Sequence, residues 1–443
     1  MDDITGLSAA ETGRRIEAGA LDARDAAEAY LSAITASPHR DAIYARVTPD
    51  AARAEADAAA DRAKRGLRRG PLDGVPISWK DLFDTAGVAT EAGSAMLKGR
   101  TPDSDATVVA RGRRAGVVSL GKTHMTELAF SGLGVNPVTA TPPNGFDPAL
   151  APGGSSSGAA ASVAYSLAAI GIGSDTGGSV RIPAAWNSLV GLKTTHGLLP
   201  PEGIVLLCEA FDTAGPLCRT VEDAALMTAV MAAAPPPDLS GATLKGARLA
   251  VLETLALDAD CRDAPRSAFE AGVAELQAAG AIVERIEAPE VAEVMTYAGG
   301  LFTGEAWAEW GEMIDVKGDL MFAPVRERFQ LGASVSAADY LRGWRKLIQA
   351  RAVWTERVAG YDAVMIPSSP ILPPDAARLL SDQDYFTGEN LLALRNTRIG
   401  NLFGLSALTL PTATPSCGLM LMGAPFGEAA LLRLGAAAEA ALS

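Results

Sequence analysis

Two short loops concentrate glycines and hydroxyl groups in one stretch of the chain. Residues 153–158 read GGSSSG, and residues 174–179 read SDTGGS. Glycine permits close backbone approach, so a Gly-Gly-Ser turn can aim consecutive N–H groups at one point, as an oxyanion or phosphate site requires. The serines add candidate nucleophiles. We therefore expect the chemistry of this protein in residues 151–195.

Two of three candidate mechanisms for these loops fit poorly. Residues 154–158 match the G-x-S-x-G pattern of a lipase-type nucleophile elbow, with Ser156 as nucleophile. Such enzymes need a histidine downstream and generally late in the chain, whereas the last histidine here is His196. A phosphate-binding loop is disfavoured because neither loop has the G-x-x-x-x-G-K-[ST] spacing.

The third mechanism uses a lysine as the base. Lys80 follows a short β-like run at residues 75–79. Burial at a strand end can lower the pKa of a lysine enough to leave a neutral amine, which can take a proton from a hydroxyl. The neighbouring Asp81 would oppose this shift if its side chain pointed the same way, but neighbours on a strand face opposite sides.

The elements around the loops read as strands and helices in alternation. Apolar strand-like runs cover residues 75–79 and 116–120, and a third run, AAIGIG, leads directly into the second loop. The segment GAAASVAYSLA, after the first loop, reads as a tightly packed small-residue helix. This alternation predicts βα units around a buried sheet, with both loops at the same sheet edge.

Composition excludes several classes of partner. The 443 residues carry a formal charge of −14 and no Lys/Arg-rich run, so we expect no direct contact with nucleic acid. The N-terminus lacks the pattern of an export signal and no apolar run approaches a membrane span, which favours a cytoplasmic protein without membrane contact. The cysteines lack metal or disulfide spacing and are interpreted as structural thiols: Cys208, Cys218, Cys261 and Cys417.

Three blocks resemble the signature of the amidase signature family. They are GVPISWKD at 74–81, APGGSSSGAA at 151–160 and GSDTGGSVRIPA at 173–184. The spacing agrees, because Ser155 follows Lys80 by 75 residues and Ser179 follows Ser155 by 24. Weaker similarities, among them GKTHMTELAFSG, FDTAGPLCRTVEDAA and DAVMIPSSP, extend the resemblance over most of the chain.

The resemblance implies a single α/β domain over residues 1–443, with a central twisted mixed sheet covered by helices on both faces. Length alone would suggest two or three domains. Within this amidase signature domain we expect four segments. They are a helical N-terminal layer at about 8–64, a catalytic core at about 71–233, a helical insertion at about 264–359 and a C-terminal return to the sheet at about 360–443.

The same resemblance implies a Ser-cisSer-Lys triad. Ser179 is the expected nucleophile, Ser155 the relay of its proton beside or within a cis peptide, and Lys80 the base and later the acid. Ser156 is a supporting hydrogen-bond partner. The family's oxyanion hole corresponds here to four backbone N–H groups, those of Thr176, Gly177, Gly178 and Ser179. No metal and no organic cofactor are expected.

Further positions are interpreted with alternatives. Asp175 and Arg181 bracket the nucleophile, and we favour a structural ion pair over direct substrate contact, although Arg181 could meet an anionic substrate. Met125 and Thr126 sit where family members often line the acyl pocket, but a methionine in an apolar stretch equally belongs to the core. No histidine receives a catalytic role.

The implied function is hydrolysis of the C–N bond of a small carboxamide through a Ser179 acyl-enzyme, with release of ammonia or an amine. The chain is compatible with a homodimer. One rival is the amidotransferase subunit that supplies ammonia to misacylated tRNA together with other subunits. A second rival is a non-catalytic binding protein on the same scaffold. The substrate stays open, because pocket loops vary independently of the triad.

Overall fold

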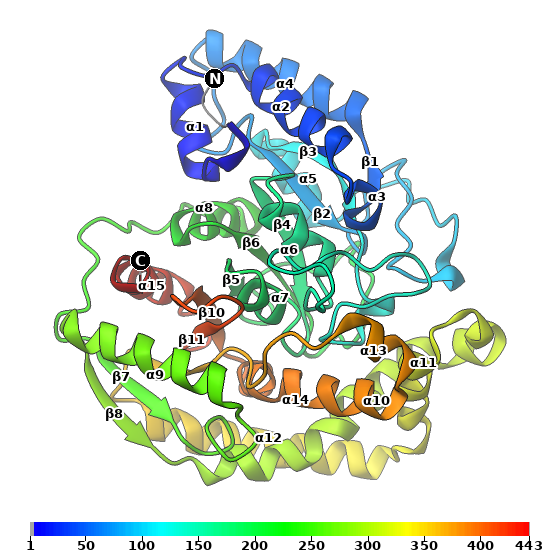
Figure 1. Ribbon diagram of the computed structural model, residues 1–443, viewed down its shortest axis with the longest axis vertical. Helices are drawn as coiled ribbons and strands as arrows, with labels where there is room; N and C mark the ends of the chain where they lie inside the picture. Colours follow the sequence, from blue (N-terminus) through cyan, green and yellow to red (C-terminus); the bar gives the residue numbers. More distant parts are fainter. Residues whose placement is uncertain (1–3, 443) are drawn as a thin grey trace.

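An eleven-stranded mixed sheet runs through the protein in the computed structural model, which describes residues 4–442 (Figure 1). The strand order is β1-β3-β2-β4-β6-β5-β10-β11-β9-β7-β8. Neighbours pair in parallel within β3-β2-β4 and β9-β7-β8, and antiparallel elsewhere. The strands are β1 (Tyr44–Val47), β2 (Pro76–Lys80), β3 (Val118–Thr123), β4 (Ile170–Asp175), β5 (Val190–Lys193), β6 (Thr213–Cys218), β7 (Arg248–Leu252), β8 (Ile282–Ile286), β9 (Ala363–Pro367), β10 (Ser406–Pro411) and β11 (Gly418–Gly423).

Helices cover the sheet along its whole length (Figure 1). One continuous sheet with helical layers confirms the expected single α/β domain. The helices are α1 (Ala9–Glu17), α2 (Ala23–Ala36), α3 (Arg40–Ile43), α4 (Pro49–Lys64), α5 (Thr107–Ala115), α6 (Ser157–Ala164), α7 (Arg181–Trp186), α8 (Val221–Ala232), α9 (Asp263–Ala278), α10 (Pro289–Lys317), α11 (Ala323–Gln330), α12 (Ala337–Val358), α13 (Ala376–Ser381), α14 (Gln383–Leu402) and α15 (Glu428–Leu442).

The strand that ends in Lys80, β2, and the strand that leads into the second loop, β4, are neighbouring internal strands of the sheet. Every residue of β2 and of β4 is buried, as expected for strands covered on both faces. Helix α6 packs very closely on β4, because a Cβ at Gly171 would lie only 2.3 Å from the carbonyl oxygen of Ala159. The small residues of α6 thus bring the first loop against the strand that ends in the second loop.

The predicted elements of the catalytic core are confirmed with small shifts. The runs at 75–79, 116–120 and 168–173 correspond to β2, β3 and β4, and Lys80 is the last residue of β2. Strand β1 was not predicted. It inserts four residues into the N-terminal helical layer and pairs antiparallel with the edge of β3.

The segment at 264–359 is mostly helical, and its strand β8 closes the far edge of the sheet beside β7. The two long helices α10 and α12 pack against each other, and α10 also contacts α11 and α14. These helices cover the end of the sheet opposite α1 and α4 (Figure 1). The division of the domain into the four segments named above remains a proposal.

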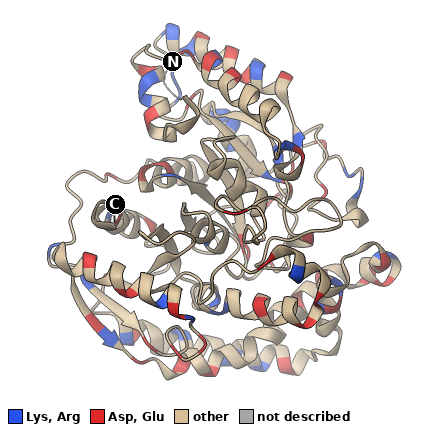
Figure 2. Ribbon diagram, in the orientation of Figure 1, with Lys and Arg blue, Asp and Glu red and all other residues tan. Residues whose placement is uncertain are grey.

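Charged residues gather on the outer helices and are sparse along the central strands (Figure 2). The four cysteines are buried and unpaired, as their spacing predicts. Within residues 4–442 no helix is long and apolar enough to cross a membrane. Against this pattern, a few fully buried charges need an explanation, among them Lys80 at the end of β2, Asp175 at the end of β4 and Arg181 at the start of α7.

Candidate active site

Lys80 lies fully buried at the end of β2 and contacts three serine hydroxyls. Its Nζ is 2.8 Å from Ser155 Oγ, 2.8 Å from Ser174 Oγ and 3.1 Å from Ser156 Oγ. Burial lowers the pKa of Lys80 to about 7, although the charges of Asp212 and Asp175 act in the opposite direction. Near neutral pH a large share of this lysine is therefore a neutral amine that can accept a proton.

A lowered pKa alone does not single out Lys80. Burial also lowers the pKa of Lys122 to about 8 and that of Lys193 to about 7. Lys122 donates to the hydroxyl of Thr90, and Lys193 donates to two backbone carbonyls. Of these three lysines only Lys80 contacts the serines of the loops, so its position and not its pKa distinguishes it from the other two.

Asp81 points away from Lys80, as the alternation of strand side chains predicts. Its carboxylate accepts a hydrogen bond of 2.9 Å from Arg46 and lies 3.4 Å from the Nζ of Lys122. The charge of Asp81 is thereby bound by other cations. It does not oppose the low pKa of Lys80.

The two loops meet through Ser156. Its backbone N–H donates to the carbonyl of Ser179 at 3.2 Å. Its hydroxyl donates to the carbonyl of Ser174 at 3.1 Å and accepts from the N–H of that residue at 3.2 Å. The peptide bond between Gly154 and Ser155 is cis. The expectation that both loops share one sheet edge is confirmed.

Ser179 is almost fully buried, with 3% of its surface exposed, and lines a small cavity of about 20 Å³. This volume is the room of about one water molecule. Within the described residues no hydrogen bond joins Ser179 Oγ to Ser155 Oγ, whereas the contact between Ser155 and Lys80 is present. Catalytic hydrogen bonds often tighten only when substrate is bound.

The backbone amides before Ser179 differ in their availability. The N–H of Gly178, one of the four expected in the oxyanion hole, already donates to Asp175 Oδ1 at 2.8 Å. In residues 4–442 the N–H groups of Thr176, Gly177 and Ser179 make no hydrogen bond. Gly178 has a φ of +137°, and a Cβ there would lie 2.1 Å from Thr397 Oγ1, which excludes any larger residue.

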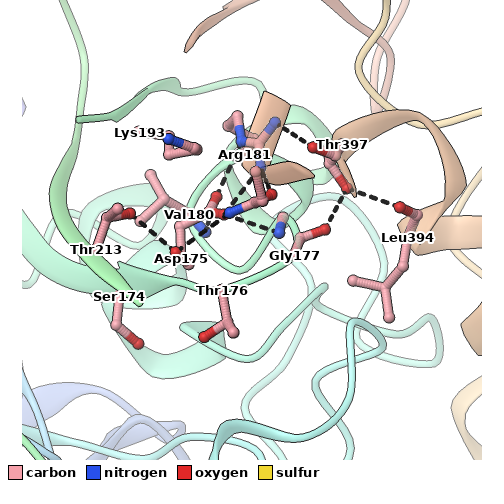
Figure 3. A network of polar contacts seen from close by, with 12 residues as sticks. Ser174, Asp175, Thr176, Gly177, Val180, Arg181, Lys193, Thr213, Leu394 and Thr397 are labelled. Carbon is pink, nitrogen blue, oxygen red and sulfur yellow. Dashed lines mark hydrogen bonds and ion pairs between the residues drawn. The ribbon is translucent and has the colours of Figure 1, made fainter. Parts of the chain in front are cut away.

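A buried ion pair fixes the second loop (Figure 3). Arg181 and Asp175 are fully buried and joined by hydrogen bonds of 2.8 and 2.9 Å. Asn401 donates to the same carboxylate at 2.9 Å, and Arg181 donates to the carbonyl of Thr397 at 2.7 Å. Burial raises the pKa of Asp175, but the charge and hydrogen bonds of Arg181 outweigh it and hold this pKa well below its usual range. The carboxylate is therefore permanently ionised.

The three residues considered as substrate contacts, Arg181, Met125 and Thr126, lie away from the cavity beside Ser179. Arg181 is enclosed and its guanidinium is already bound to protein groups, so it does not reach a substrate. Met125 and Thr126 are fully buried and do not line the cavity beside Ser179. The N–H of Thr126 instead donates to the carbonyl of Ser155 at 3.1 Å and so supports the first loop.

Replacing Arg181 with methionine is expected to destabilise the fold by about 3–5 kcal/mol, because the charge of Asp175 would remain buried without its partner. The free energy of unfolding from urea denaturation measures this loss. A change of the same type at the exposed Arg345 should stay within about 0.5 kcal/mol of the wild type. Equal stabilities of the two variants would contradict the structural role of the pair.

Several residues of the site escaped the sequence analysis as individual positions. Ser174 contacts Lys80, although the sequence offered it only as the start of the second loop. Asp212 accepts hydrogen bonds from the Thr176 hydroxyl and from the N–H of Leu207, and burial raises its pKa to about 6. Asp212 belongs to the FDTAGPL segment, and the resemblance of this segment to the family was the one feature of the sequence that could have pointed to it.

Comparison with known proteins decides the family. A sequence profile described as Amidase matches residues 25–432. The chain belongs to the amidase family. Within that family it is 37% identical to the 2-amino-5-chloromuconic acid deaminase of Comamonas testosteroni, over 89% of this chain and 87% of that protein. It is also 34% identical to a glutamyl-tRNA(Gln) amidotransferase subunit from an Anaeromyxobacter strain, over 99% of this chain and 96% of the relative.

The solved structures agree with the amidase family. A crystal structure described as an amidase superposes with a TM-score of 0.88 at 30% identity, covering 99% of this chain and 100% of the other. The resemblance of the three sequence blocks to the amidase signature is thus confirmed. The protein is an amidohydrolase, an enzyme that acts on C–N amide bonds.

Proposed function

We propose that the protein hydrolyses a small carboxamide through a covalent acyl-enzyme on Ser179 and releases ammonia or an amine. The observation that carries this proposal is the 2.8 Å contact between the buried Lys80 Nζ and Ser155 Oγ, at the junction with the loop of Ser179. A neutral amine at this position can act as a base for the serine hydroxyls.

In the proposed acylation, Ser179 Oγ attacks the carbonyl carbon of the amide while its proton passes to Ser155. The hydroxyl proton of Ser155 passes at the same time to Lys80, which becomes an ammonium ion. The carbonyl π electrons move onto oxygen, and the N–H groups of Thr176, Gly177 and Ser179 stabilise the resulting oxyanion. One such donor is worth about 3 kcal/mol in the transition state.

Collapse of the tetrahedral intermediate restores the carbonyl and breaks the C–N bond. The leaving nitrogen takes its proton along the reverse path from Lys80 through Ser155. Water then attacks the acyl-enzyme and gives a proton to the same relay. The bond between Ser179 Oγ and the acyl carbon breaks as Ser179 Oγ takes this proton back from Lys80 through Ser155, and the carboxylic acid product leaves. Every proton that the lysine accepts is returned within one cycle.

The pH dependence of kcat/KM should report the neutral form of Lys80. Below pH 7 the lysine is protonated, so the rate should rise about tenfold per pH unit, and above about pH 7 it should level off. An ordinary lysine would place the midpoint near about 10.4. Initial rates between pH 5.5 and 9 measure this profile, and a flat profile over that range would contradict a lysine base.

A hydrolysis screen across small aliphatic, aryl and ureido amides, with detection of released ammonia, tests the proposed activity. The Ser179→Ala variant serves as the blank. The proposal is supported if the wild type hydrolyses at least one of these amides and the Ser179→Ala variant hydrolyses none of them. A wild-type rate in the variant would end it.

A second candidate is the glutaminase component of a tRNA amidotransferase, which the similarity to the Anaeromyxobacter protein favours. In that case the chain would work together with other subunits and would hydrolyse glutamine. Affinity purification from the native host distinguishes the two functions. Stoichiometric recovery of a second subunit with glutaminase activity would favour the amidotransferase, and activity of the isolated chain on other amides would favour the amidase.

A further inference from the structure

Two arginines line the small cavity beside Ser179. Arg328 comes from α11 and Arg398 from α14, and Phe302 from α10 lies with them. The same three residues also line a second cavity of about 310 Å³. The two cavities therefore adjoin at these three residues, which lie between the larger cavity and the nucleophile.

Neither arginine has an acidic partner. In the part of the chain that the structure describes, neither guanidinium forms an ion pair, and no carboxylate contributes to the pKa of either arginine. Arg328 donates to the carbonyl of Phe130 at 2.8 Å and lies 4.2 Å over the ring of that residue. The Arg398 guanidinium makes no hydrogen bond to a described residue and lies 5.7 Å from the ring of Phe302.

The one carboxylate that lines the larger cavity does not compensate these charges. Glu327 accepts a hydrogen bond from Gln383 and forms no ion pair with either arginine. Burial lowers the pKa of Arg398 to about 10. Burial, and then the positive charge of Arg398, also lower the pKa of Arg328 well below its ordinary value. Two like charges thus lie near each other on half-buried side chains.

Charges in such surroundings are normally paired, because desolvation of an unpaired ion is costly. Arg181, which is fully buried, follows this rule through its ion pair with Asp175. Arg328 and Arg398 depart from it at the entrance to the reacting centre. We therefore expect the ligand itself to carry the negative charge that pairs with these two arginines.

Arg398 also lies close to the backbone that would hold the reacting carbonyl. A Cβ at Gly177 would be 3.5 Å from Arg398 Cγ and 3.9 Å from its Nε. Gly177 supplies one of the free N–H groups of the second loop. A group bound by Arg398 is consequently only a short chain away from a carbonyl attacked by Ser179.

We propose that the substrate is a short amide that carries a carboxylate, and that Arg328 and Arg398 bind this carboxylate. The inference rests on the proposed amidase activity and names its substrate class. A planar guanidinium matches a carboxylate with two parallel hydrogen bonds, and charge-assisted bonds of this kind are stronger than neutral ones. An uncharged amide of the same size leaves both cations without a partner.

Matched pairs of substrates test this directly. Succinamate carries a carboxylate where succinamide carries a second carboxamide, and the two compounds are otherwise identical. The pair malonamate and malonamide has a shorter chain, and the pair glutaramate and glutaramide has a longer one. For at least one pair we expect kcat/KM of the wild type to favour the anion about tenfold or more, after correction for the two equivalent amides of the neutral compound.

The variant Arg398→Met should remove this preference, so that its loss in kcat/KM for the anion exceeds its loss for the diamide about tenfold or more. Arg398→Lys, which keeps the charge but not the planar fork, should recover part of the preference. Arg345→Met removes one positive charge from an exposed position on α12 and should keep the wild-type ratio. It controls for the change in net charge.

Binding gives a readout that does not depend on catalysis. Titration calorimetry with succinate and glutarate should detect binding to the wild type and to Ser179→Ala, and weaker binding by about tenfold or more to Arg398→Met. If succinate binds but no amide is hydrolysed, the proposed function fails while the anion site stands. If neutral amides are hydrolysed as well as their anionic partners, or if Arg398→Met lowers both equally, the inference is overturned.

Discussion

Replacing Ser179 with alanine abolishes amide hydrolysis, with an expected fall in kcat of about 10⁴-fold or more. Removal of the nucleophile from a serine hydrolase leaves only binding and oxyanion stabilisation to accelerate the reaction. Ammonia release measures the rate. Intact-protein mass spectrometry after treatment with a fluorophosphonate measures the covalent adduct, which should form on the wild type and be absent from the variant.

A neighbouring serine provides the matched control. Ser157 is also fully buried, and its hydroxyl has no hydrogen-bond partner among the described residues. Ser157→Ala therefore also removes one serine Oγ, but from the first loop and without breaking a hydrogen bond. This variant should keep the wild-type rate of hydrolysis and should still be labelled by the fluorophosphonate. Labelling of Ser179→Ala to the same extent as the wild type would show that the nucleophile is another residue.

Replacing Lys80 with methionine should lower kcat/KM by about 10³-fold or more, because Lys80 is the titratable group that contacts the Ser155 hydroxyl among residues 4–442. The variant should also lose the midpoint near pH 7. Lys80→Arg should fail to restore the rate, since a guanidinium stays protonated and cannot act as a base. Rates measured across the pH range test all three statements.

Lys193 is the control for the general effects of a buried lysine. Its pKa is also about 7, but its ammonium group binds only backbone carbonyls. Lys193→Met leaves these carbonyls unpaired, so the melting temperature should fall, yet the midpoint of the pH profile should stay where it is. If the midpoint moves in Lys193→Met and stays unchanged in Lys80→Met, then Lys193 is the base and the role proposed for Lys80 is wrong.

Much of the fold and the arrangement of the two loops could be predicted because both depend on local chemistry. The apolar runs before Lys80 and before Ser174 are short, fully buried strands, and their residue types alone indicate this. The glycines around Ser155 and Ser179 indicate that the backbone of each loop packs closely against its surroundings. Strand β1 gave no such signal, since four residues at a sheet edge are too few to establish a periodicity.

The remaining features depend on contacts between segments that are distant in the sequence. The N–H of Gly178 is occupied by a hydrogen bond to the carboxylate of Asp175, and this bond depends on the orientation of that carboxylate. Asn401 on α14 helps to hold the carboxylate in place. Arg328 and Arg398 read in the sequence as ordinary charges on amphipathic helices. Only the packing of α10, α11 and α14 turns them toward Ser179.

Helix α14 serves two purposes with adjacent residues. Thr397 and Asn401 bind the loop of Ser179, whereas Arg398 lines the cavity. On the proposal that Arg398 binds the substrate carboxylate, point substitutions at position 398 should change the substrate preference while Thr397 and Asn401 still hold the loop of Ser179. Insertion or deletion of one residue upstream in the helix would rotate these positions by about 100° and disturb both at once. In the evolutionary history of this scaffold, α14 should tolerate replacement of its cavity residue far more readily than any change in its length.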